Sequence, residues 1–381
     1  MRNIDPKVEE AIETLNMKDG VARRRLLTGT GLVSATAAAS AFLAACTSST
    51  NNPTSAGTAK TTVGNFPKTP SWKFVFVNHV TTNAFFTPTQ YGAADACALL
   101  GCSYQWTGSQ TSSVPEMVTA LNTAVSGSAN GIALAVTSTT GFTSPVATAL
   151  AAGIPVVSYN ADGAVGDPGT ARLAYIGQDL YVSGQQVGAQ LATKMSAGAT
   201  KAVGFIATPG QLNIQPRIDG ATAALKLKGI SVTSVATGAT LTPESTAIPA
   251  WLAAHGSTVQ GAFAVDGGST SLLGPALAKY GLTSKVASGG FDLEPATLQA
   301  VKAGQLGFTI DQSPYLQGFL PVVYLYLYNL SGGLVSPPTT DTGLRFVTAS
   351  NVAPYLSTST RFEGSSTKEQ IVPRSGAIAT S

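Results

Sequence analysis

Short apolar runs alternate with longer amphipathic segments from Trp72 onward, and this alternation limits the folds open to the chain more than any other feature. The first run, WKFVFVNHV (72–80), is rich in the β-branched and aromatic residues that favour strands. A helical segment at 87–100 follows and ends at Gly101. Strands that alternate with helices of this length form parallel sheets covered by helices on both faces. The sequence therefore predicts an α/β fold.

The alternation restarts after residue 177, which predicts two lobes of similar build. Further strands are expected at 103–107, 131–137, 154–160, 172–177, 201–208, 230–237, 261–267, 285–292, 304–310 and 343–349. Helices are expected at 115–125, before Gly153, at 180–195, 214–228, 243–255, 270–280, 293–303 and 314–330, with a Gly/Pro/Ser-rich loop at 331–342. Asp179 stands where its side chain would cap the helix that follows. In such sheets, ligands bind at the carboxyl ends of strands, where the strand order reverses.

The composition argues against several classes of function. The chain has 381 residues, of which 11% are charged, and a net charge of +3. Nucleic-acid binding needs a basic patch or stripe, and the sequence has no basic block beyond Arg23–Arg25. The only imidazoles are those of His79 and His255, and no zinc-binding or P-loop motif occurs. We therefore expect no nucleic acid, metal or cofactor.

The N-terminal segment has the order of an export signal. Arg23–Arg25 precede a mildly apolar stretch at 26–45, which ends at Cys46. The arginines and the weak apolar stretch resemble a twin-arginine signal, and LAAC (43–46) resembles a bacterial lipobox, whose cysteine receives a lipid. We expect residues 1–45 to be removed and Cys46 to carry the lipid anchor. An uncleaved membrane anchor and a short core helix are the alternatives.

Residues 46–71 are expected to form a tether. They are rich in Ser, Thr, Asn, Pro and Gly and lack apolar periodicity, a composition that cannot bury a core. The protein is therefore expected outside the cytoplasmic membrane, attached through lipid, with a globular body that begins at Trp72.

Polar and aromatic residues collect where the predicted strands end. These candidate ligand contacts are Asn83, Phe85, Phe86, Trp106 and Asn160 in the first half, and Arg217, Asp266, Asp292 and Gln312 in the second. Side chains of Asp, Asn, Gln and Arg satisfy hydroxyl groups, which both donate and accept hydrogen bonds. Flat aromatic rings pack against the C–H faces of sugar rings. The set predicts a site for a neutral monosaccharide or small polyol.

Several of these side chains also fit a structural role. Phe85 and Phe86 fit a core position at the start of a helix, and strand-end aromatics such as Trp106 are often core residues. Asp266 and Asp292 stand where they would cap the helices that follow, a role compatible with ligand binding. His79 and His255 are expected to be structural rather than ligand contacts.

Cys97 and Cys102 stand five residues apart across the end of a predicted helix. In an exported protein, two such cysteines form either a small-loop disulfide or a pair of free thiols, and the sequence leaves both open.

From Trp72 to about Val352, the chain resembles the ribose-type sugar-binding proteins of bacterial ABC importers, which have the type I periplasmic-binding-protein fold. The matching motifs are NAFF (83–86) where the family usually has N-P-F-F, RIDG (217–220) for its R-x-x-G, GFD (290–292), and TIDQSPYLQG (309–318) at a lobe crossing. The resemblance implies two similar lobes, each a parallel sheet sandwiched by helices. A three-crossing hinge would join them, with the ligand cleft between.

The implied boundaries place 72–178 and 313–343 in the first lobe, 179–312 and 344–365 in the second, and 366–381 in a tail. By the resemblance, Asn83, Phe85 and Phe86 are first-lobe contacts, and Arg217, Asp266, Asp292 and Gln312 are contacts from the second lobe and the hinge. Two positions depart from ribose binders, which commonly have Asp-Arg where this chain has Asn160-Ala161 and often have Asn at the position of Asp266. We therefore do not expect ribose itself.

The expected function is capture of a monosaccharide or small polyol by a monomeric receptor, without catalysis, for delivery to an ABC permease. One alternative is a receptor for a sensor or signalling system, for example for a furanosyl autoinducer. A more remote alternative is an exported carbohydrate-active enzyme, which would need two carboxylates flanking a glycosidic bond. Asp266 and Asp292 would both come from one lobe, which argues against that arrangement.

Overall fold

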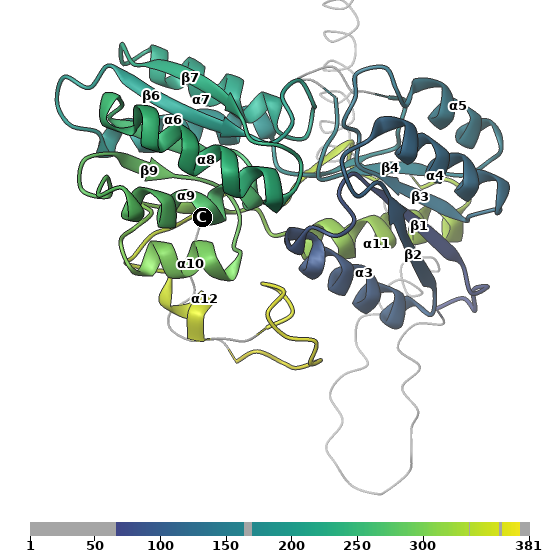
Figure 1. Ribbon diagram of the computed structural model, residues 1–381. Helices are drawn as coiled ribbons and strands as arrows, with labels where there is room; N and C mark the ends of the chain where they lie inside the picture. The colour runs from purple at the N-terminus through teal and green to yellow at the C-terminus, as the bar shows by residue number, and fades with distance from the viewer. Residues whose placement is uncertain (1–65, 164–169, 335, 358–359, 374–381) are drawn as a thin grey trace, which may run out of the picture. The chain divides into compact units, whose positions relative to one another are not determined.

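The structure, a computed structural model, describes residues 66–163, 170–334, 336–357 and 360–373. The predicted signal, Cys46 and nearly all of the predicted tether lie outside these residues. Among the helices described, none combines the length and the apolar character that a membrane crossing needs. The described chain forms two α/β lobes, as the alternation of strands and helices predicts (Figure 1).

The first lobe is built on a six-stranded parallel sheet with the order β11-β5-β4-β3-β1-β2. Its strands are β1 (Lys73–Asn78), β2 (Ser103–Gly108), β3 (Gly131–Leu134), β4 (Val156–Tyr159), β5 (Tyr175–Gly177) and β11 (Thr339–Asp341). The expectation of a loop throughout 331–342 is wrong, because β11 pairs with β5 in this segment. The sequence TTD lacks the apolar signal of a strand, and its pairing partner lies far away in the chain.

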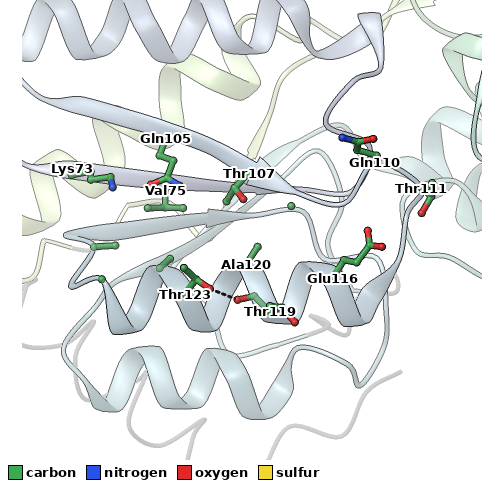
Figure 2. Close-up of a pocket in the computed structure, with 14 residues that line it drawn as sticks. Lys73, Val75, Gln105, Thr107, Gln110, Thr111, Glu116, Thr119, Ala120 and Thr123 are labelled. Atoms are coloured by element: carbon green, nitrogen blue, oxygen red, sulfur yellow. Dashed lines mark hydrogen bonds between the residues drawn. The ribbon is translucent and has the colours of Figure 1, made fainter.

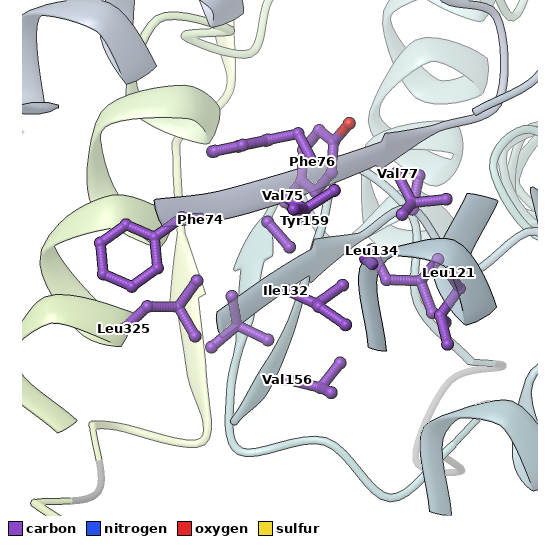
Figure 3. Packing of buried hydrophobic residues seen from close by; sticks show 14 of the residues in the cluster. Phe74, Val75, Phe76, Val77, Leu121, Ile132, Leu134, Val156, Tyr159 and Leu325 are labelled. Carbon is purple, nitrogen blue, oxygen red and sulfur yellow. The ribbon is translucent and has the colours of Figure 1, made fainter. Parts of the chain in front are cut away.

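Helices cover both faces of this sheet (Figure 1). They are η1 (Ala84–Phe86), α3 (Thr87–Leu100), α4 (Val114–Ser126), α5 (Thr143–Ala151) and α11 (Leu316–Ser331). Successive residues of β1 point to opposite sides: Phe74 lies toward Leu325 of α11, and Val77 lies toward Leu121 of α4 (Figure 3). This two-residue period is what a strand buried on both faces requires.

The ends of α3 follow from its sequence. Pro88 stands in the first turn, where its missing N–H costs nothing. Gly101 ends the helix in the left-handed region, with φ 70° and its N–H donating to the Cys97 carbonyl. The expected range of 87–100 is confirmed. Cys97 and Cys102 are both free cysteines in the structure, so it contains the pair of thiols rather than the disulfide.

The second lobe contains a four-stranded parallel sheet with the order β7-β6-β8-β9. Its strands are β6 (Lys201–Ile206), β7 (Ser231–Ala236), β8 (Gly261–Ala264) and β9 (Ala287–Gly289). The expectation of a single parallel sheet is incomplete, because β10 (Thr309–Asp311) pairs antiparallel with β12 (Arg345–Val347). Since β10 leads the chain out of this lobe and β12 leads it back in, the two run in opposite directions.

Helices also cover both faces of the second sheet. They are α6 (Leu180–Lys194), α7 (Gln215–Lys226), α8 (Leu241–His255), η2 (Gly256–Thr258), α9 (Gly267–Lys279), α10 (Pro295–Lys302) and α12 (Ala353–Ser357). The core is divided by the sheet: Phe263 belongs to the cluster with α6 and α7, whereas Ala262 belongs to the cluster with α8 and α9. Asp179 caps α6 as expected, because its side chain accepts a hydrogen bond from Val182 N.

The chain passes between the lobes after β5, after β10 and after β11, which gives the expected three crossings. A further contact lies beyond α12. The carboxylate of Asp95, on α3 of the first lobe, forms a 2.5 Å ion pair with Arg361. The ring of Phe362 lies 4.7 Å from that of Tyr315. Arg361 and Phe362, which the sequence assigned to the second lobe, thus contact the first lobe.

A candidate ligand-binding cleft between the lobes

A polar cavity between the two lobes collects most of the residues that the sequence nominated. Its lining consists of His79, Asn83, Phe85, Phe86, Asn160, Asn213, Ile214, Arg217, Asp266, Gly267, Asp292 and Gln312. Eight of the nine candidate contacts are in this set, and Trp106 is the exception. Segments distant in sequence therefore meet at one place, at the carboxyl ends of strands in both sheets.

The first-lobe wall is shaped by η1. The Oδ1 atom of Asn83 accepts a 3.0 Å hydrogen bond from Phe85 N and so caps this short helix. The rings of Phe85 and Phe86 meet edge to face, 4.7 Å apart. Phe86 is 2% exposed and belongs to the first-lobe core, whereas Phe85 is half-buried. Phe86 thus joins the cavity to the core, and Phe85 offers the more accessible ring.

Trp106 does not line the cavity, contrary to its nomination as a contact. Its ring stacks 5.9 Å from that of Phe76 in the first-lobe core. Its indole N–H donates to the Thr81 carbonyl at 3.2 Å. The indole group is therefore satisfied within the lobe, and the core alternative describes its position in the structure.

A chain of side-chain amides links the first lobe to Asp292 through the hinge. Asn160 Nδ2 donates to Gln317 Oε1 at 3.0 Å, and Gln317 Nε2 donates to Gln312 Oε1 at 3.1 Å. Gln312 Nε2 in turn donates to Asp292 Oδ1 at 2.5 Å. All four residues are buried. Burial raises the pKa of the Asp292 carboxyl to about 6, although Arg217 and Gln312 oppose this shift.

Arg217 is only 3% exposed, and contacts on several sides hold its guanidinium group in place. Its Nη1 donates to the Val265 carbonyl at 2.9 Å, and its Nη2 donates to Gln178 Oε1 at 3.3 Å. Its Nε has no partner. Gly184 of α6 lets α7 approach closely, since a Cβ there would lie 2.2 Å from the Arg217 carbonyl oxygen. Burial lowers the arginine pKa, and Asp292 counteracts that effect.

The two second-lobe aspartates are held differently. Asp266 caps α9: Oδ1 accepts from Ser269 N at 2.8 Å, and Oδ2 accepts from Ala207 N at 3.2 Å. The expected capping role is confirmed for this residue. It is wrong for Asp292, because the residue before α10 is Glu294. Asp292 instead adopts a left-handed φ of 77°, which Asp tolerates better than most residues.

Two polar side chains that line the cavity, those of His79 and Asn213, were not nominated as ligand contacts by the sequence. His79 Nδ1 and Asn213 Oδ1 are buried without hydrogen-bond partners, like Arg217 Nε. Burial, aided by Arg217, lowers the pKa of His79 to about 4, so its imidazole is neutral near pH 7. Buried polar atoms normally have partners, and the three residues that carry these atoms line one cavity. They mark where a polar ligand would complete the hydrogen bonding.

Asn213 reaches the cavity because the loop after β6 contacts the other lobe. The neighbouring residue Leu212 donates its N–H to the Thr137 carbonyl at 3.0 Å and joins the first-lobe core. A signal was present in the sequence, since PGQLN follows directly from an apolar strand. The contact with the opposite lobe, which places Asn213, is a tertiary feature that the local sequence does not encode.

The lobes are in contact around this cavity. Ser112 Oγ donates to Gln211 Oε1 at 2.5 Å, and Gln211 Nε2 donates back to the Ser112 carbonyl at 3.0 Å. The free volume between the lining side chains is about 40 Å³, room for a few water molecules at about 10–15 Å³ each. A monosaccharide therefore needs the lobes or the lining side chains to move apart before it can enter.

A larger cavity of about 760 Å³ lies within the first lobe, beside the edge strand β2 and α4 (Figure 2). Gln105, Thr107 and Glu116 are among its lining residues. It contains none of the nominated contacts, and none of the unpartnered buried atoms in the described chain belongs to it. The cleft between the lobes is therefore the stronger candidate for specific recognition.

The chemistry of the cleft suits a neutral, hydroxyl-rich molecule. Two carboxyl groups, Asp266 and Asp292, and one guanidinium group, Arg217, line the site, so the cation offsets part of the carboxylate charge. Amides supply both donors and acceptors. No group of His, Cys, Asp and Glu in the described residues is arranged to hold a metal ion. Two lobes around such a cavity define a bilobed solute-binding protein.

Residues 74–332 match the family described as "Periplasmic binding protein domain". The chain belongs to this family. It is 49% identical over 315 residues to the xylose/arabinose-binding protein XylF of Sulfolobus acidocaldarius, a match that covers 80% of this chain and 77% of that protein. This class of protein binds solutes, so the chain is a binding protein and not an enzyme.

Solved structures agree in fold. An ABC transporter solute-binding protein from Burkholderia graminis, in complex with D-arabinose, aligns with a TM-score of 0.68 and 24% identity over 75% of this chain and 98% of that one. A carbohydrate transporter from Acidothermus cellulolyticus, in complex with myo-inositol, aligns with a TM-score of 0.66 and 25% identity over 75% and 96%.

Proposed function

We propose that the protein captures a pentose, xylose or arabinose, in the cleft between its lobes and delivers it to an ABC permease. The observation that carries this proposal is the set of three buried, unpartnered polar atoms around the cleft: His79 Nδ1, Asn213 Oδ1 and Arg217 Nε. The 49% identity to a xylose/arabinose-binding protein supports the choice of sugar. The departures from ribose-type motifs at Asn160 and Asp266 argue against ribose itself.

Each side chain would have a distinct task. The carboxyl groups of Asp266 and Asp292 would accept hydrogen bonds from sugar hydroxyls, and Arg217 and Asn213 would pair with the ring oxygen or the remaining hydroxyls. The exposed face of Phe85 would cover the C–H groups. A micromolar affinity corresponds to about −8 kcal/mol. Spread over the ten heavy atoms of a pentose, that value is within the efficiency limit for very small ligands.

Closure would be the signal that reaches the transporter. A ligand that binds only the closed form shifts the lobes toward it, and the permease can then distinguish loaded from empty protein. We further propose that the receptor is a monomer exported through the signal at 1–45 and held by a lipid on Cys46. This location would place the cleft outside the cytoplasmic membrane, where the sugar is encountered.

The ligand is tested with a thermal-shift screen of the full chain against pentoses, hexoses and polyols. We expect saturable stabilisation by xylose or arabinose and no chemical turnover of either. A melting temperature that no sugar or polyol changes would refute the ligand class. Stabilisation by a hexose or polyol alone would refute the pentose assignment. The anchor is tested separately by mass spectrometry of the membrane fraction, with Cys46→Ser as the unlipidated control.

A further inference from the structure

A pair of buried carboxyl groups lies directly behind the cleft in the second lobe. Glu244, in the first turn of α8, is 3% exposed, and its carboxyl group lies beside that of Asp266: Ser269 donates its hydroxyl to Glu244 Oε1 at 3.3 Å and its backbone N–H to Asp266 Oδ1 at 2.8 Å. Two carboxyl groups in such contact share a proton, because like charges this close cannot both ionise in a buried site. One member of the pair is therefore a neutral acid, and it donates to the other.

The remaining partners decide which member keeps the proton. Asp266 accepts from two backbone N–H groups, those of Ser269 at 2.8 Å and Ala207 at 3.2 Å, and such bonds favour the charged form. Glu244 accepts only a 3.3 Å hydrogen bond from the Ser269 hydroxyl. The same hydroxyl is also hydrogen-bonded to Thr237 Oγ1 at 2.9 Å. Burial and the neighbouring Asp266 raise the pKa of Glu244 to about 9. Glu244 is the acid.

The surroundings leave the Glu244 carboxyl little freedom. The first turn of α9 lies against it, since a Cβ on Gly268 would be 2.2 Å from Oε2. The other titratable groups that act on the pair are Glu294 at the start of α10, Asp292 after β9, and Arg217 of α7. Of these, only Arg217 is a cation, and it acts on Asp266.

We propose that Glu244 is a positioning residue for ligand binding: as a neutral acid, it donates to Asp266 and holds that carboxylate with its free lone pairs toward the cleft. The inference rests on the proposed function, in which Asp266 contacts the sugar. When Glu244 ionises in alkaline solution, the two carboxylates repel each other. Asp266 then loses its orientation, and the affinity for the sugar falls.

The test is calorimetric titration of the full chain with D-xylose and L-arabinose from about pH 7 to about pH 10. The wild type is expected to bind about tenfold more weakly at the alkaline end, a range that spans the Glu244 pKa of about 9. Glu244→Gln keeps a donor but cannot ionise, so its affinity should match the wild type within about twofold at pH 7 and stay constant. Glu116→Gln, in the other lobe, should follow the wild type.

Two results would overturn the assignment. One is an alkaline loss of affinity in Glu244→Gln that runs parallel to the wild type. The other is a loss that disappears in Glu294→Gln while persisting in Glu244→Gln, since Glu294 would then be the group that titrates. Glu244→Leu, which lacks a donor, should bind more weakly at every pH if it folds. Rescue by Gln but not by Leu separates positioning from simple space filling.

A ligand-free measurement separates this inference from the proposed function. If the wild type binds neither pentose at pH 7, the proposed function fails, and the pair is judged by thermal unfolding alone. Because its pKa is raised in the folded state, Glu244 binds more protons there than in the unfolded chain, so its contribution to stability falls as pH rises between about 4.5 and about 9. Glu244→Gln should show a shallower fall. Equal slopes of stability against pH in the wild type and in Glu244→Gln would contradict the assignment of Glu244 as a buried neutral acid.

Discussion

The guanidinium group of Arg217 lies over the ring of Phe291, with 4.1 Å between Cζ and the ring centroid. Phe291 is fully buried, and it directly precedes Asp292, one of the proposed sugar contacts. A planar guanidinium group can stack on an aromatic ring while its N–H groups donate in the plane, and a lysine ammonium cannot reproduce this geometry. The stack therefore fixes the single cation of the cleft lining in one orientation.

Arg217→Lys should weaken pentose binding by about 10- to 100-fold, the equivalent of about 1.5–3 kcal/mol for hydrogen bonds to a charged group. The charge is kept, but the stack and the in-plane donors are lost. Isothermal titration calorimetry measures the change. Arg172→Lys is the matched control, because Arg172 forms a 2.7 Å ion pair with Asp162 outside the cleft lining. Equal affinities of the wild type and Arg217→Lys for the pentose would show that the Arg217 guanidinium group does not contribute to sugar binding.

The contacts between the lobes should control how often the cleft opens. Gln211→Ala removes both hydrogen bonds to Ser112, and Arg361→Met removes the ion pair with Asp95. Each variant should increase the radius of gyration of the ligand-free protein in small-angle scattering. The double variant should show the larger increase, because it releases two independent restraints on opening. Added pentose should return all variants to the compact form. A radius that neither substitution alters would show that these contacts do not limit opening.

Gly184→Ala should affect stability and binding together. Its new methyl group would lie 2.2 Å from the Arg217 carbonyl, so α6 and α7 must separate. We expect a loss of about 1–3 kcal/mol in the free energy of unfolding, as for other overpacked sites, and weaker sugar binding from the displaced arginine. Gly127→Ala is the control, since its Cβ would meet nothing closer than 3.1 Å. Denaturant titration and calorimetry report the two effects. If Gly184→Ala is destabilised but keeps its full sugar affinity, the packing of α6 against α7 does not affect the binding site.

The neutral state of His79 predicts a specific loss of stability in acid. Its pKa is lowered to about 4 by burial, whereas the unfolded residue titrates near 6.5. Between these values the unfolded chain binds more protons, so the contribution of His79 to stability rises with pH from about 4 to about 6.5 and falls on acidification. His79→Gln should flatten this part of the melting-temperature profile. His255→Gln, at an exposed position, should leave it unchanged. If His79→Gln still loses stability steeply in acid, groups other than His79 cause that loss.

Local sequence signals predicted most of the secondary structure. Pro88 and Gly101 define the limits of α3, and Asp179 caps α6 as expected. These features depend on neighbours within a few residues, which is why the sequence reveals them. The strand β11 escaped prediction because its polar residues form a strand only through pairing with β5.

The site was predictable to the extent that it lies at strand ends. Asp266 and Asp292 follow apolar strands, so their convergence follows from the parallel sheet. Asn213 was missed because a contact between lobes brings it to the cleft. Trp106 was nominated by the same strand-end rule, but its ring turns to the core and its N–H is satisfied by Thr81. Side-chain direction at a strand end depends on packing that a single sequence does not reveal.

The most direct test of the account is calorimetric titration of D-xylose and L-arabinose into the wild-type chain and into Asp292→Asn. Asparagine tolerates the left-handed φ of 77° at this position, so the fold should persist, as thermal unfolding would verify. We predict saturable binding of at least one pentose to the wild type, in the micromolar range or tighter. The variant should bind at least about 30-fold more weakly, the equivalent of about 2 kcal/mol. Unchanged affinity in Asp292→Asn, or a wild type that binds neither pentose, would contradict the account.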